Sequence, residues 1–457
     1  MDWFAVSYVV LTIASIAAAV GFVALWRALA APHMATGLAL AYYYSLFGAW
    51  RIVSLKQTGQ EAEALSHLES SLFAVTIDDN YVLALVVYAV FLLAIVCAAC
   101  LLTRNNGRLP PLRHADLRLR HGWILAISLT CLAISIGIEW QGIRSALEEG
   151  IAAYASTRAG ESRLYTLHQL ANRIGLAALA IGLGACLAVR TKLRPVLVCY
   201  AMVALAWGAF LAVLGNRAEL LIAAVAGFLW YYSLGGRMRP VAAVVTAGIG
   251  FLVLRIVEAT RGTAVTEATA GLGQLLSSFD FWNPLNVLAG SESLAAHLSL
   301  YGVLSHDIPF TYGSSFLYLV SSFVPRVLLV DRPADIYTIY IDALSVADQQ
   351  GFNIHYATGW YLNFGLAGII LGALIVVGIW GWLLRTVQRL ARTGSRFAVH
   401  WNCTLCFCLG FTPALMRNGP EGLKGLIVEA IAVPLLVALV GVGVRGSLQS
   451  RPVAIRA

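Results

Sequence analysis

The chain has 457 residues, of which 60% are hydrophobic and 12% charged, and its formal net charge is +8. Soluble domains are about 45–50% apolar and about 25% charged, so this composition excludes an ordinary soluble protein and predicts an all-α, multi-pass membrane protein. The basic residues lie in short loops between apolar segments and do not alternate with exposed aromatic residues, which argues against a nucleic-acid partner.

Apolar runs long enough to cross about 30 Å of hydrocarbon recur from Phe4 to Val444. Hydropathy predicts about eleven spans. The first run lacks the basic start and the cleavage site of a signal peptide, so we expect it to be retained. The predicted spans are Phe4–Trp26, Ala35–Val53, Tyr81–Leu102, Trp123–Trp140, Ile174–Val189, Pro195–Leu214, Ala218–Leu234, Val241–Val257, His355–Leu384, Phe397–Leu415 and Leu423–Val444.

The basic loops all fall on one side of these spans and are assigned to the cytoplasm, because short cytoplasmic loops are enriched in Lys and Arg. They are residues 103–122, 190–195, 235–240 and 385–396 and the tail after Arg445. The amino terminus is then outside and the carboxyl terminus inside. The outer segments include residues 59–80 and 141–173 and one large loop, 258–354.

Two apolar runs in the large outer loop, 284–304 and 314–330, would raise the count to about thirteen spans if both crossed the membrane. We favour re-entrant or surface helices, because Pro325 and Arg326 would otherwise lie within the hydrocarbon, where a charge is costly. The whole chain, 1–457, is predicted to be a single transmembrane domain.

All eight cysteines fall inside apolar runs. A metal or redox centre needs a polar surrounding shell, so we expect small core residues instead.

Six arginines lie on the predicted outer side, against the usual charge bias of membrane proteins. Each one alone is explained equally well by snorkelling to headgroups or by pairing with a nearby carboxylate. As a set they favour a pocket for an anion such as phosphate, because guanidinium groups bind phosphate oxygens in pairs. They are Arg217, Arg255, Arg261, Arg326, Arg332 and Arg417.

Four short motifs resemble the Wzy-type polymerases of oligosaccharide repeat units, a family of bacterial inner-membrane proteins. They are GNRAEL (215–220), VPRVLLVDRP (324–333), YLNFGLAG (361–368) and MRNG (416–419). Trp360 stands where the analogy leads us to expect an acidic residue.

The resemblance implies a GT-C-like fold and an inverting, metal-independent glycosyltransferase without a cofactor. It would polymerise glycans linked to undecaprenyl diphosphate into O-antigen or exopolysaccharide at the periplasmic face of the inner membrane. Membrane lipids, a chain-length regulator and a flippase are further expected partners. The alternatives are an O-antigen ligase and a flippase or other transporter of lipid-linked glycans.

Such a reaction needs cations for the departing diphosphate and a base for the acceptor hydroxyl. We expect Arg217, Arg255, Arg326 and Arg417 to bind the diphosphate, with Arg261 and Arg332 behind them. The candidate bases are His306, Asp307 and His355, and the sequence does not choose among them. Weaker candidates are Asp280 and Glu292.

Overall fold

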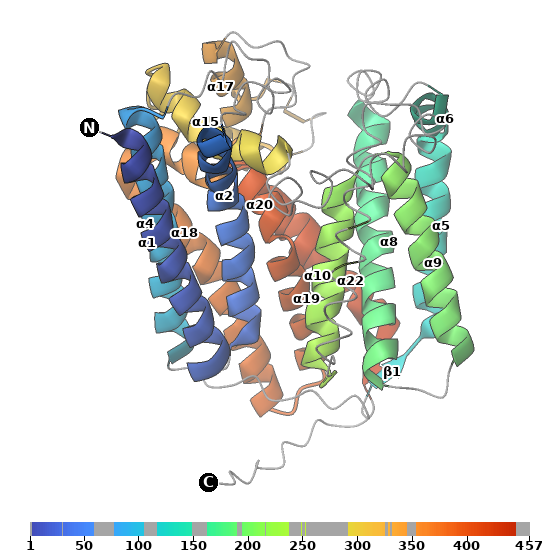
Figure 1. Cartoon of the computed structure of the whole chain (residues 1–457). Coiled ribbons are helices and arrows are strands. Elements are labelled where there is room, and N and C mark those ends of the chain that lie inside the picture. Colours follow the sequence, from blue (N-terminus) through green and yellow to red (C-terminus); the bar gives the residue numbers. More distant parts are fainter. Residues whose placement is uncertain are drawn as a thin grey trace. The chain divides into compact units, whose positions relative to one another are not determined.

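The computed structural model shows an all-α membrane protein with one small sheet (Figure 1). Seven helices in the described part of the chain are long and apolar enough to cross a membrane. The structure describes residues 2–29, 31–58, 77–104, 117–148, 162–189, 194–214, 216–236, 248, 252, 291–324, 328–329, 331–344 and 353–444.

The helices divide between two compact units. Unit 1 contains residues 1–108, 282–381 and 412–427, and unit 2 contains residues 109–281, 382–411 and 428–457. The prediction of a single domain with one large outer loop remains a prediction.

Unit 1 begins with three helices that pack together, α1 (Trp3–Val23, continued by the π-helix η1, Ala24–Ala28), α2 (Pro32–Thr58) and α4 (Asp79–Arg104). Gly21 makes the close approach of α1 to α4 possible, because a Cβ there would lie 2.6 Å from Val96 Cγ1. The other face of α1 has exposed apolar residues, and only 28% of the most apolar stretch of α1 and η1 is buried. Such a face suits a helix that contacts lipid.

Three short helices follow in unit 1, from within the predicted outer loop: α15 (Ser291–Ser305), α16 (Ser314–Ser321) and α17 (Ile336–Leu344). None of them is among the helices that could cross a membrane. Helix α15 packs against α2 and α4. Both α15 and α17 lie at the end of unit 1 where α1 begins (Figure 1).

The longest helix, α18 (Tyr356–Arg392), starts in unit 1 and is interrupted at Phe364 and Gly365, where the backbone is not helical. Gly365 has φ 59°, which favours glycine. Unit 1 also contains α20 (Thr412–Arg417) and α21 (Gly422–Gly425), which are joined by a tight turn. The π-helix η4 (Leu426–Ala432) then leads into unit 2.

Unit 2 is built around α8 (Ser162–Val189), which contacts α5 (His121–Ile138), α9 (Arg194–Val213), α10 (Arg217–Ser233) and α22 (Val433–Gly441). The most apolar stretch of α8 is 72% buried, against 28% in α5 and in α9, so α8 lies inside the unit whereas α5 and α9 face outwards. Among its described residues, unit 2 also contains α6 (Trp140–Glu148), the end of α18 and α19 (Phe397–Gly410), which is almost wholly buried.

The small sheet was not predicted. Strand β1 (Leu117–Leu119) pairs antiparallel with β2 (Val442–Val444), which joins the start of α5 to the end of α22. Three-residue strands offer too little alternation to be detected in a sequence.

Seven predicted spans coincide with the seven apolar helices, which confirms a polytopic helical protein. Two more predicted spans, Ala35–Val53 and Ala218–Leu234, lie on α2 and on the shorter α10, and Phe397–Leu415 covers α19 with part of α20. The span Val241–Val257 lies almost wholly outside the described residues. The total of about eleven therefore remains a prediction.

The packing of α8 can be tested at Gly175. A Cβ there would contact Trp207 Cζ2 and lie 2.9 Å from Cys131 Cβ, whereas a Cβ at Gly137 in α5 would meet nothing within 4 Å. We expect Gly175→Ala to destabilise the protein by about 1–3 kcal/mol. Gly137→Ala should stabilise it by roughly 0.5–1 kcal/mol. Thermal unfolding in detergent measures both, and equal midpoints would contradict the packing.

Candidate functional site

The first candidate site is the turn between α20 and α21, which we call the loop site (Asn353, Ile336, Arg417 and Glu421). Gly419 takes φ 61° in this turn, and its N–H donates to the Ile354 carbonyl at 2.8 Å. Ile354 also forms a parallel bridge with Asn418. These backbone contacts place Asn353 beside Arg417, whose Nε donates to Asn353 Oδ1 at 3.0 Å.

Glu421 is the second charged residue of the loop site. Its Oε1 accepts the backbone N–H of Ile336, the first residue of α17, at 3.1 Å. Its Oε2 is buried and accepts no hydrogen bond in the part of the chain that the structure describes. Burial raises the pKa of Glu421 to about 7, with a smaller contribution from Asp335, while the Ile336 N–H opposes the rise.

The loop site thus combines a guanidinium with a carboxyl group that changes charge near neutral pH. A carboxyl with a pKa near the working pH is suited to accept and release a proton. A guanidinium remains charged and binds phosphate or carboxylate oxygens. The four-residue spacing of Arg417 and Glu421 keeps the two functions on one turn.

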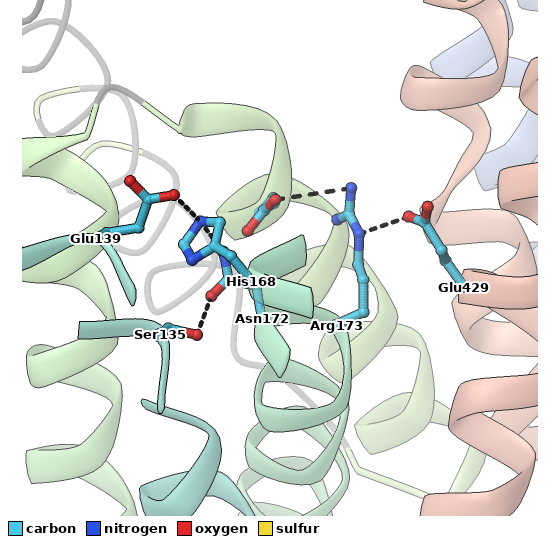
Figure 2. A network of polar contacts seen from close by, with 7 residues as sticks. Ser135, Glu139, His168, Asn172, Arg173 and Glu429 are labelled. Atoms are coloured by element: carbon cyan, nitrogen blue, oxygen red, sulfur yellow. Dashed lines mark hydrogen bonds and ion pairs between the residues drawn. The ribbon is translucent and has the colours of Figure 1, made fainter. Parts of the chain in front are cut away.

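The second candidate site is a polar network inside unit 2, which we call the ion network (Figure 2). Arg173 of α8 donates through Nε to Glu429 Oε2 of η4 at 2.7 Å, and its Nη2 lies 3.9 Å from Glu219 Oε1 of α10. Its guanidinium also lies 5.8 Å from the centre of the Phe411 ring. The Arg173 side chain is 15% exposed and that of Glu219 is 7% exposed.

The ion network continues one turn away on α8. Ser135 donates to Asn172 Oδ1 at 2.7 Å, which turns the amide nitrogen of Asn172 towards His168 Nε2, 3.0 Å away. His168 Nε2 also lies 3.6 Å from Glu139 Oε1 (Figure 2). Charged side chains that are buried between apolar helices often mark binding sites or ion paths.

Two of the predicted bases lie together after α15. His306 and Asp307 are both exposed, and Asp307 has φ 48°. His306 Nδ1 lies 3.1 Å from the carbonyl oxygen of Gly302, which can only accept, so Nδ1 carries the proton. In the neutral ring the other nitrogen then has a lone pair, as a base requires.

The third predicted base, His355, is fully buried at the start of α18. Its Nδ1 accepts the Ala357 N–H at 3.1 Å, so Nε2 carries the proton towards Ser45 Oγ, also at 3.1 Å. His297 of α15 donates from Nδ1 to the Ser45 carbonyl at 2.9 Å. Both histidines therefore join α15 and the start of α18 to α2.

Burial lowers the pKa of His297 to about 4, so its ring is neutral at physiological pH. Both nitrogens of His355 already have partners inside unit 1. The role of His355 as a base remains a prediction, although this position suits a structural role.

The structure describes the side chains of two of the six predicted arginines, Arg332 and Arg417. Arg332 donates from Nη2 to the Val324 carbonyl, and Arg417 belongs to the loop site. Arg217 is the first residue of α10, but its side chain lies outside the described part of the chain. Outside it as well are Arg255, Arg261, Arg326 and Asp280, together with the side chain of Glu292. A single pocket of six arginines remains a prediction.

Sequence reasoning did not single out Arg173, His168, Glu421 or Glu429 as functional residues. The available signal was a charge inside an apolar run: Glu429 interrupts the last predicted span, and Arg173 immediately precedes the span that starts at Ile174. Because a charge in an apolar run needs a partner, Arg173 and Glu429 could have been predicted to form an ion pair. Glu219, two residues after Arg217 in the sequence, lies beside Arg173.

No family model matches the chain, and neither does any curated protein or solved structure.

The ion network predicts a large cost for removing its cation. Arg173→Gln should lower the free energy of unfolding by about 3 kcal/mol, because two largely buried carboxylates lose a partner. Arg144→Gln is the matched control, since the Arg144–Glu148 pair is 74% and 58% exposed and should contribute about 0–1 kcal/mol. Chemical denaturation in detergent compares the two, and a similar small loss in both would contradict the network.

Glu421 predicts a pH-dependent stability. Its folded pKa is about 7, above the ordinary 4.5, so its contribution is complete below pH 4.5 and is lost as pH rises through about 7. The unfolding midpoint of the wild type should therefore fall across that interval more steeply than that of Glu421→Gln. Identical slopes for the two proteins would show that Glu421 has an ordinary pKa.

Proposed function

We propose that the protein is a glycosyltransferase that polymerises lipid-diphosphate-linked oligosaccharide repeat units. The observation that carries the proposal is the loop site, in which Arg417 and a carboxyl group with a pKa near 7 share one turn. The motif that holds Arg417, MRNG, is one of the four on which the resemblance to Wzy-type polymerases rests. The helical membrane architecture is consistent with a lipid-carried substrate.

In the proposed reaction, an acceptor hydroxyl oxygen attacks the anomeric carbon of the donor glycan. The bond from that carbon to the diphosphate oxygen breaks, and the lipid diphosphate leaves with both electrons. Arg417 binds the leaving diphosphate and neutralises its growing charge. Glu421 in its carboxylate form takes the hydroxyl proton, for which a pKa near the working pH is favourable.

The remaining predicted residues keep supporting places in this proposal. Arg326 and Arg332, which belong to unit 1 as Arg417 does, would bind further phosphate oxygens. The same role for Arg217, Arg255 and Arg261 remains a prediction. His306 is the second choice of base, because it is exposed and its Nδ1, rather than Nε2, contacts the Gly302 carbonyl. Activation of the acceptor needs only one of them, so Glu421 and His306 are alternatives.

A second candidate function, transport of the lipid-linked glycan, is favoured by the ion network alone. Arg173, Glu219 and Glu429 come from three helices of unit 2 and are mostly shielded from solvent. Charges in this position are common along the substrate paths of transporters. The loop site has no role in that reading, and for this reason we place transport second.

The test is reconstitution of the purified protein in liposomes with lipid-diphosphate-linked repeat units and no nucleotide. We expect a ladder of products on a gel. Arg417→Ala should reduce polymer at least ~100-fold, and Arg417→Lys should restore little, because lysine lacks the forked donors. Arg144→Ala, at an exposed pair, is the control and should keep full activity.

Three outcomes would reject the proposal in distinct ways. Glycan that crosses the bilayer without elongation would indicate transport. Transfer only to an added acceptor of another kind would indicate a ligase. A normal ladder from Arg417→Ala at equal protein level would remove the loop site from the reaction.

A further inference from the structure

Helix α16 exposes apolar side chains and buries a serine, which is the opposite of what a helix on a water-exposed surface does. Ser315 and Ser322 face the protein and are buried, at 0% and 6% exposure. Leu317 and Val320, three residues apart and therefore on one face, are 62% and 69% exposed. The exposed apolar side chains continue beyond the helix at Phe323, Val324 and Leu328.

The buried face of α16 is fixed to the interruption in α18. Asn363 Nδ2 donates to Ser315 Oγ at 2.8 Å, and Thr311 Oγ1 donates to Asn363 Oδ1 at 2.9 Å. The Thr311 N–H donates to the Leu362 carbonyl at 2.8 Å, which gives that carbonyl of the interrupted helix a partner. These bonds leave α16 little freedom to turn its apolar face inwards.

Aromatic contacts connect this region to the outer surface of α18. Phe316 stacks on Phe364 with ring centres 5.7 Å apart, and Phe310 lies 5.6 Å from Tyr361. Phe364 is itself 44% exposed, and the same helix continues with exposed Leu366 and Ile370. The apolar surface of α16 is thus joined to that of a helix that could cross the membrane.

We infer that residues 310–324, together with Leu328, form an interfacial element whose apolar side chains lie among the lipid acyl chains at the outer edge of the bilayer. A short helix with a large apolar face and a polar boundary is stable there, with its apolar side chains below the headgroups. Tyr312, 83% exposed, lies near one end of this element, and Arg332 donates to the Val324 carbonyl at the other end; both residue types suit the headgroup layer.

The inference is independent of the proposed activity. For the apolar run 314–330 the sequence favours a re-entrant or surface helix, and the inference selects the surface position for α16. Solvent water is a poor alternative environment, because contiguous exposed apolar side chains of this size are rare on a soluble surface. A second copy of the chain is the other possible cover, and the experiment separates it from lipid.

The test introduces a photoreactive benzophenone amino acid, one position at a time, into the full chain. Purified variants are reconstituted in vesicles of phosphatidylethanolamine and phosphatidylglycerol that contain a radiolabelled phospholipid. Positions 317 and 320 are the test sites. Ile370, an exposed residue of α18, is the positive control, and Thr338, an exposed polar residue of α17, is the negative control.

We expect label transfer at positions 317 and 320 to match that at 370 and to exceed that at 338 severalfold. Transfer at 317 and 320 as low as at 338 would overturn the inference. Crosslinked dimers without lipid label would overturn it as well, and would assign the face to a second copy. Size-exclusion profiles identical to wild type ensure that each variant is folded.

Discussion

The structure depends on one constraint: a polar group away from water must find its partner within the protein. Arg173 contacts two carboxylates and an aromatic ring, and His297 and His355 contact Ser45. The Leu362 carbonyl, at the interruption of α18, accepts the Thr311 N–H. Each of these contacts joins segments that are distant in the sequence, so buried polar groups connect the apolar helices to one another and to the loops between them.

The same constraint explains what could be predicted. Hydropathy identifies long apolar runs because every residue of such a run contributes to the signal. The structure confirms the predicted apolar helices at α4 and α18. The environment of α16 could not be predicted firmly, because its eight residues are too few to show which face is buried. Strand β1 was not predicted because it has only three residues. The sequence did not show which helices pack together, since apolar side chains are interchangeable as neighbours.

The candidate site was predictable only where a residue type carries its chemistry by itself. Arg417 could be selected because an arginine on the predicted outer side is unusual. Glu421 could not, because its raised pKa comes from burial against α17 and from Asp335, and neither is visible in the local sequence. Arg173 and Glu429 are 256 residues apart, and no local pattern connects them.

Arg417 is connected to a buried, hydrogen-bonded part of unit 1 around His355. Asn353, which orients the guanidinium, lies two residues before His355, whose backbone N–H donates to Ser299 Oγ at 3.0 Å and whose ring is enclosed. An anion that reaches Arg417 therefore meets a side chain whose rotamer is already selected. Little conformational entropy is lost on binding, so more of the interaction energy remains for affinity.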